Sequence, residues 1–267
     1  MQRSRFARNL YISGDQYLEG FLGLSWFPSQ TARTNADNYE SWVNWTLNTV
    51  WSRFTGSRVI MTISARRGTV TIIPRDATPD PTKMFERFRP PQDLICNAEG
   101  KPLRPKDARI AGTPWFEDGK DYPTTTATGL GSDAIIPINP WLFAKLSCGS
   151  SVPVNRADFV LIHELMHGLA SLSGRMADYE PAPRPFDNLE EFSAIVIGNI
   201  YISESGGTDL VGGHHDEILP RELMSGQAFY NAYKEPLQRM CANQGQLVRE
   251  LRNGVNIPHN PLLFCDL

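Results

Sequence analysis

The chain has 267 residues, 41% of them hydrophobic, and its 26 basic and 29 acidic side chains give a formal charge of −3. A chain of this length can bury a sizeable core as one large domain or two small ones. It has no basic run long enough to follow a phosphate backbone and no stretch of eighteen apolar residues. We therefore expect neither a nucleic-acid partner nor a membrane span.

Residues 1–35 have a mixed, aromatic-rich sequence, which favours an irregular lead-in. Their basic start is not followed by the apolar segment of a signal peptide, because Ser13, Gly14 and Asp15 interrupt it. We expect a protein made in the cytoplasm without a cleavable signal, so that any export uses a specialised route. Residues 36–267 are expected to form a single domain.

The first regular elements are expected from residue 38 onward. Residues 38–54 have helical spacing and end before Gly56; their expected core positions are Trp42, Trp45, Val50 and Trp51. Residues 58–64 and 69–74 are rich in β-branched side chains and are joined by a short segment that ends in glycine, which is typical of a hairpin. A helix and a hairpin ahead of further helices indicate an α+β fold with a small mixed sheet.

Residues 75–125 are rich in proline and charge, and we interpret them as a long insertion. Residues 129–140 then resemble a short strand. Pro137 cannot donate a ladder hydrogen bond, so this strand is expected at a sheet edge. Such an edge can bind an extended peptide through main-chain bonds, or it can be an ordinary edge strand; the sequence favours neither.

The most informative segment is Phe159–Gly168, which contains His163-Glu164-Leu-Met-His167. Asn155 and Asp158 are expected to cap a helix here. On a helix, residues four apart have Cβ atoms about 5–6 Å apart, so two imidazoles can converge on one ion with Zn–N distances of about 2.0–2.1 Å. Glu164 is then placed as a general base for a water in the open position.

A third ligand is expected downstream, because catalytic zinc usually takes three protein ligands. Asp187 as the N-cap of a second apolar helix would place Glu190 in a capping box and leave Glu191 to face the metal. A cap at Asn188 would exchange the two glutamates. We predict His163, His167 and Glu191 as the metal ligands, with Glu190 as the alternative.

Other histidines are weaker candidates. A metzincin site would need glycine and histidine where the chain has Ala170 and Ser173, so that class is excluded. His214 and His215 can serve as an alternative ligand or as donors to an oxyanion, or can lie in a solvated turn, whereas His259 is interpreted as a loop residue.

The C-terminal part is expected to be helical. Residues 221–233 and 235–252 are amphipathic, with Tyr230, Leu237, Met240, Leu247 and Leu251 as predicted core positions, and Gly254 ends the second helix. The tail from residue 256 is either docked or mobile. The cysteines Cys96, Cys148, Cys241 and Cys265 lack metal-site spacing; two disulfides are allowed, and reduced thiols are the default for a chain this long.

The zinc motif, together with Asn188–Ala194 and Ile200–Glu204, resembles the His-Glu-x-x-His plus Glu metallopeptidases, the gluzincin-like group. The chain is most similar to the bacterial secreted effector and toxin branch, which includes anthrax lethal factor and type III or type VI effector peptidases. The resemblance implies a zincin-like catalytic domain whose edge strand lies above the metal helix, and it places the third ligand at Glu191. The thermolysin branch fits poorly, because its members have an aspartate that orients a histidine four residues after the ligand glutamate. This chain has Ile195 at that position.

The expected function is therefore a zinc-dependent endopeptidase acting on a protein substrate, in which Zn²⁺ is the cofactor and Glu164 the general base. Tyr179 and His215 are the candidates to assist the oxyanion, with His214 beside them. The resemblance also suggests secretion into a target cell and an immunity protein as partner. Two alternatives stay open: a zinc-containing binding module without turnover, and a zinc hydrolase of a small amide.

Overall fold

The computed structural model describes residues 1–14, 30–74, 101–102, 131, 133–138, 156–175, 180–213, 217–254 and 256–266. Its strands are β1 (Gln2–Arg3), β2 (Leu10–Ile12), β3 (Val70–Pro74), β4 (Lys101–Pro102) and β5 (Ala134–Ile138). Its helices are α2 (Gln30–Trp51), α3 (Phe54–Ser64), α7 (Ala157–Ser173), α8 (Leu189–Glu204), η2 (Arg221–Leu223), α9 (Gly226–Ala232), α10 (Lys234–Asn243), α11 (Gly245–Leu251) and η3 (Pro261–Phe264). The α+β class and the small mixed sheet expected from the sequence are confirmed.

The sheet has the strand order β1-β2-β3-β5-β4. Strands β2, β3 and β5 are parallel, whereas β1 and β4 pair antiparallel at the two margins. Side chains alternate along β3 between buried and half-buried positions, which is the pattern of a strand with one face on the core. The sheet therefore presents an apolar face made of Leu10, Ile12, Val70, Ile72, Ile136 and Ile138.

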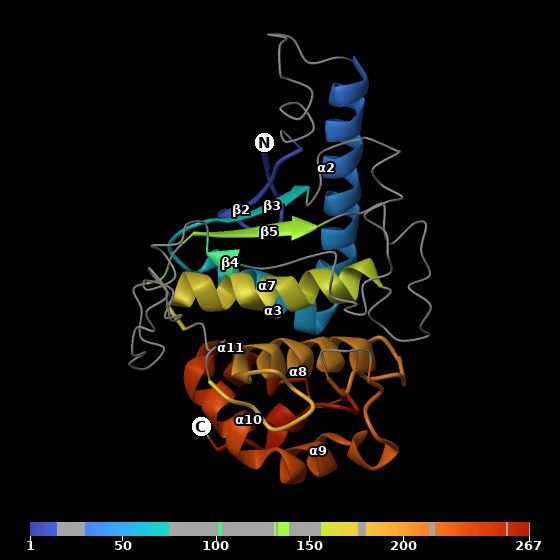
Figure 1. The fold of residues 1–267 in the computed structure, drawn as a ribbon, viewed down its shortest axis with the longest axis vertical. Coiled ribbons are helices and arrows are strands. Elements are labelled where there is room, and N and C mark those ends of the chain that lie inside the picture. Colours follow the sequence, from blue (N-terminus) through green and yellow to red (C-terminus); the bar gives the residue numbers. More distant parts are fainter. Residues whose placement is uncertain are drawn as a thin grey trace.

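Helix α7 lies between this sheet and the C-terminal helices (Figure 1). On the sheet side, a Cβ placed at Gly168 would lie 3.4 Å from Val70 and 3.7 Å from Ile136, so the helix packs closely on the strands. On the other side, a Cβ at Gly198 of α8 would come within 2.4 Å of the Phe159 ring. Glycine at 198 therefore permits the close approach of α7 and α8.

The expected hairpin is wrong, because residues 58–64 belong to helix α3. Val59, Ile60 and Ile63 lie on one buried helical face despite their β-branched side chains. Distant residues stabilise both helix ends: the Glu204 carboxylate accepts hydrogen bonds from the first backbone N–H groups, and Asn9 Nδ2 donates to the Ile63 carbonyl at 2.9 Å. These tertiary caps outweigh the local strand propensity.

Strand β5 confirms the element expected within 129–140, but its position needs correction. It lies between β3 and β4, so its first two residues, Ala134 and Ile135, are paired on both sides. Within the described part of the chain, β4 extends no further along it. The stretch from Ile136 to Ile138 is thus the only portion with an outer edge left by the described strands. Apart from residues 101–102, the insertion at 75–125 lies outside the described residues.

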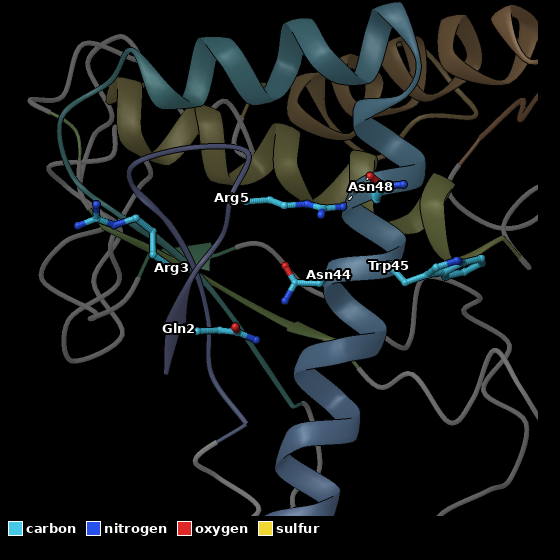
Figure 2. Close-up of a pocket in the computed structure, with 6 residues that line it drawn as sticks. All are labelled: Gln2, Arg3, Arg5, Asn44, Trp45 and Asn48. Carbon is cyan, nitrogen blue, oxygen red and sulfur yellow. Dashed lines mark hydrogen bonds between the residues drawn. The ribbon is translucent and has the colours of Figure 1, made fainter.

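The irregular lead-in expected for residues 1–35 is wrong in two places, since β1 and β2 extend the sheet and α2 begins at Gln30. The core role expected for Trp45 is also wrong: its side chain is 66% exposed, and Figure 2 shows it extending outward from α2. Val50 is fully buried as expected, and Trp42 and Trp51 are partly buried against the core. Val43 and Leu47 are buried as well.

The C-terminal residues form a compact helical layer below α8 in Figure 1. Each expected helix is divided into two, at Met224–Ser225 and at Gln244, but all five predicted core positions are buried. The tail is docked rather than mobile, because Leu262 is fully buried and Asn260 caps the turn η3. Among the helices described, none is both long and apolar enough to cross a membrane.

Candidate metal centre

Helix α7 presents His163, Glu164 and His167 toward the interior, with exposures of 1%, 1% and 6%. The expected cap is wrong in its details. Arg156 occupies the N-cap position without a side-chain cap, and Asn155 lies outside the described residues. The helix ends at Gly174, whose φ of 63° is the left-handed conformation that glycine adopts readily.

Helix α8 supplies two carboxylates from its first turn. Its N-cap is Asn188, not Asp187: the Asn188 side chain accepts a hydrogen bond from Glu191 N at 2.8 Å. The sequence argument held that such a cap would exchange the roles of Glu190 and Glu191, and this inference is wrong. Asn188 caps through the backbone of Glu191 and leaves the Glu191 carboxylate available to α7.

Three potential ligand side chains converge where the two helices meet. His163 Nε2 lies 3.1 Å from His167 Nε2 and 3.1 Å from Glu191 Oε2, and His167 Nε2 lies 3.5 Å from Glu191 Oε1. Two atoms each about 2.0–2.1 Å from one ion at a tetrahedral angle are about 3.3 Å apart. The His163–His167 and His163–Glu191 distances are close to this value, and one ligand atom from each of the three residues forms a triangle whose corners lie within 4.8 Å of one another. His163, His167 and Glu191 are therefore a group that can hold a metal ion.

The two histidines differ at their other ring nitrogen. His167 Nδ1 lies 3.2 Å from Glu190 Oε1, and Glu190 is only 4% exposed. A hydrogen donated from Nδ1 to this carboxylate leaves Nε2 as the lone-pair nitrogen and holds the ring orientation. His163 Nδ1 is buried without a hydrogen-bond partner among the described residues. Glu190 is thus an outer partner of the centre rather than a ligand.

The centre has an excess of negative charge. Burial alone would lower the pKa of His167, but the carboxylates of Glu191, Glu190 and Glu164 outweigh it and raise this pKa to about 10. Glu164 must lie close to His167 to take part in this effect. These carboxylates favour a positive charge at this place, either a proton on His167 or a metal ion held by His163, His167 and Glu191.

The opposite end of the α7–α8 interface contains a second polar group. Asp158 accepts hydrogen bonds from Arg156 at 2.6 and 3.1 Å and from the Tyr201 hydroxyl at 2.7 Å. Burial would raise the pKa of Asp158, but these hydrogen bonds and the Arg156 charge lower it. Because Tyr201 belongs to α8, this contact fixes the register of the two helices that carry the metal ligands. No local sequence pattern indicates this pairing.

The segment after α8 is tied back to that helix. Asn199 donates from Nδ2 to Val211 O at 2.7 Å and accepts from Val211 N at 2.8 Å. Val211 then forms an isolated antiparallel bridge with Ile218. His214, His215 and Tyr179 lie outside the described residues. Their predicted roles stay predictions.

Two further features lie outside this centre. His259 belongs to no helix or strand, which confirms the expected loop position, but its side chain is buried against Phe229 and hydrogen-bonds through Nδ1 to Met224 O at 3.0 Å. The hollow in Figure 2 is lined by Gln2, Arg3, Arg5, Asn44, Trp45 and Asn48. Its side chains do not converge, because Trp45 and Arg3 extend away from the space between strand and helix.

Comparison with protein families, curated proteins and solved structures finds no match to this chain. The geometry of His163, His167, Glu190 and Glu191 therefore carries the functional interpretation.

Proposed function

We propose that this chain is a zinc-dependent endopeptidase with a zincin-like catalytic domain. One observation carries the proposal: one ligand atom from each of His163, His167 and Glu191 lies within 4.8 Å of the other two, and Glu164 follows the first ligand directly. Two histidines and one carboxylate are the ligand set of a catalytic zinc site, which keeps one position open. Within the described parts of the chain the group has three ligand side chains and no fourth.

The protein residues divide the chemistry among them. A zinc ion bound here would polarise the scissile carbonyl and lower the pKa of a water to about 7. Glu164 takes the proton from the attacking water and later delivers it to the leaving amine. Glu190 keeps the His167 ring in the orientation that directs Nε2 to the ligand triangle.

Substrate access is proposed from the Glu191 side of the centre. The Glu191 side chain is 18% exposed, compared with 1% for His163 and 7% for His167. The sheet packs on α7, and β5 from Ile136 to Ile138 has an outer edge that β4 does not cover. An extended peptide can pair with such an edge through main-chain hydrogen bonds. This arrangement favours a protein substrate over a small amide.

The test combines metal content with peptide-bond cleavage. The wild-type chain and Glu164→Gln are each added to bacterial and eukaryotic cell lysates, and new protein amino termini are identified by mass spectrometry. We expect both proteins to contain about one zinc per chain, and only the wild type to generate new termini. Zinc binding without cleavage by the wild type would favour a binding module, and cleavage by Glu164→Gln would contradict the mechanism.

We also propose that the peptidase is a secreted effector that acts in a target cell and is neutralised by an immunity protein in its producer. The resemblance of His163–His167, Asn188–Ala194 and Ile200–Glu204 to effector peptidases motivates this role. Expression of the wild type in the compartment where the substrate resides should be toxic, whereas Glu164→Gln at equal abundance should be harmless. Equal growth of both strains in bacterial and eukaryotic hosts would contradict the effector role.

A further inference from the structure

Two buried cysteines meet in the C-terminal helical layer, away from the candidate metal centre. Cys241 lies in α10 and Cys265 directly follows η3; each is 2% exposed, and both are free thiols. Neither cysteine belongs to the candidate metal group of His163, His167 and Glu191. Their function is not explained by the proposed peptidase chemistry.

The two thiols are hydrogen-bonded to each other. This hydrogen bond is the largest influence on both groups: it raises the pKa of Cys241 and lowers the pKa of Cys265. The two sulfur atoms are therefore neighbours in the folded chain, and the Arg252 charge lies near both of them.

The backbone on both sides of the contact is fixed. Cys265 N donates to Leu262 O at 3.2 Å, and Arg252 Nη1 donates to Cys265 O at 3.0 Å. Asn260 donates to Leu251 O at 3.0 Å and accepts from Leu262 N, so the whole turn is held against α11. Cys241 lies on a regular helix whose neighbours Leu237 and Met240 are fully buried. The contact is thus built into the fold.

We propose that Cys241 and Cys265 form a disulfide in an oxidising compartment, covalently joining the C-terminal turn to α10. The oxidant is a small-molecule or protein disulfide. The Cys265 thiolate attacks one sulfur of that disulfide, forms a mixed disulfide and releases one thiol. The Cys241 thiolate then attacks Cys265 Sγ and releases the second thiol. Two protein thiols are oxidised by two electrons, and one external disulfide is reduced to two thiols.

The link acts on the layer that supports the metal centre. Helix α10 packs on α8, which carries Glu190 and Glu191. The disulfide closes a loop of roughly 25 residues, and such links generally stabilise the folded state by restricting the unfolded chain. For a protein of this size we expect the unfolding midpoint to rise by roughly 5–10 °C. Zinc content should be the same in both redox states.

The experiment uses the full chain with Cys96→Ser and Cys148→Ser, so that the proposed pair supplies the remaining thiols. The folded protein is equilibrated with oxidised glutathione, unfolded under acid quench, and alkylated. We expect a product lighter by two hydrogen atoms, unreactive to alkylation, with a linked peptide joining positions 241 and 265. Its unfolding midpoint should exceed that of the reduced protein, and dithiothreitol should reverse both changes.

Matched single variants, Cys241→Ser and Cys265→Ser, should form no internal link and should show no oxidant-dependent rise in the midpoint. The proposal is overturned if both thiols of the folded parent remain open to alkylation, or if each carries a separate glutathione. Because the reduced and oxidised parent are the same polypeptide, this comparison stands even when a serine variant folds poorly.

Discussion

The two ends of the α7–α8 interface bury the same kinds of polar groups but differ in charge balance. At one end, the Asp158 carboxylate is satisfied by the guanidinium of Arg156 and the hydroxyl of Tyr201. At the other end, two histidines face the carboxylates of Glu164, Glu190 and Glu191, and the pKa of His167 is raised to about 10. The first group pairs its carboxylate with a guanidinium and a hydroxyl, whereas the second gathers several carboxylates around two imidazoles and can hold a metal ion.

This difference separates a polar cluster that is satisfied within the helix interface from a group that can hold a metal ion. A satisfied buried network orients helices and needs no ligand, because each charge has a partner of opposite sign. A buried cluster with an excess of one charge costs stability unless a ligand of opposite charge binds to it. Helices α7 and α8 run antiparallel. The Asp158–Tyr201 contact at one end of their interface therefore sets the register that places Glu191 opposite His163 and His167 at the other end.

The largest expected effect follows from breaking the unbalanced end. Glu191→Ala removes one corner of the ligand triangle, and we expect zinc affinity to fall by more than about 100-fold. Competition with a fluorescent zinc chelator measures this affinity. Glu180→Ala is the matched control, because it removes a carboxylate that pairs weakly with Arg239 at 3.9 Å and should leave the affinity unchanged. Wild-type affinity in Glu191→Ala would exclude Glu191 as a ligand.

A buried histidine without carboxylates sharpens the comparison. Burial lowers the pKa of His259 to about 4 from its ordinary 6.5, even though Met224 O accepts a hydrogen bond. Between these values the unfolded chain binds more protons, so the free energy of unfolding decreases as the pH falls from 6.5 toward 4. We expect the wild type to lose about 2–3 kcal/mol more between pH 7 and pH 4.5 than His259→Asn, measured by urea unfolding.

His259→Asn keeps a side-chain donor for Met224 O but cannot titrate in this range. Parallel pH dependences in the two proteins would contradict a neutral, buried His259 and would place the acid sensitivity elsewhere.

An intermediate effect is expected at Glu190, which acts through His167. Glu190→Ala should weaken zinc binding by about 10–100-fold, because the Nδ1 hydrogen bond is lost. Glu190→Gln keeps an acceptor oxygen but not the charge, so its loss should be smaller. The same chelator competition distinguishes the two variants. Unchanged affinity in both would mean that Glu190 does not orient the ring.

The smallest effect is expected at the balanced end. Tyr201→Phe removes one hydrogen bond to Asp158 but leaves the two from Arg156, so the free energy of unfolding should decrease by about 1–2 kcal/mol. Zinc affinity should stay within about 2-fold of the wild type once the protein is folded. A loss of zinc binding as large as that of Glu191→Ala would show that the two ends are not separable.

The sequence was most informative where one helix alone carries the pattern. His163 and His167 lie four residues apart on α7 and share one helical face, and Glu164 follows the first of them. Glu191 was predicted as a metal ligand, and it lies in the group, although the capping argument for it used Asp187 instead of Asn188. The useful signal was the pair of adjacent glutamates at the start of an apolar helix. The same signal indicated that Glu190, which contacts His167, belongs near the metal group.

The sequence was least informative where distant segments decide the structure. Residues 58–64 form a helix because Glu204 and Asn9 satisfy its ends, and neither contact leaves a local pattern. The pairing of β3 with β2 and β5, rather than with a neighbouring segment, depends on long-range register in the same way. Asp158 and Tyr201 also lie far apart in the chain, so their hydrogen bond could not be derived from spacing.

The central claim is that His163, His167 and Glu191 together bind one zinc ion. X-ray absorption at the zinc edge of the purified full-length chain tests it most directly. We predict nitrogen and oxygen scatterers at about 2.0–2.2 Å, with the multiple-scattering signature of two imidazoles, and loss of one oxygen scatterer in Glu191→Ala. Sulfur scatterers at about 2.3 Å, or an unchanged spectrum in Glu191→Ala, would contradict the assignment.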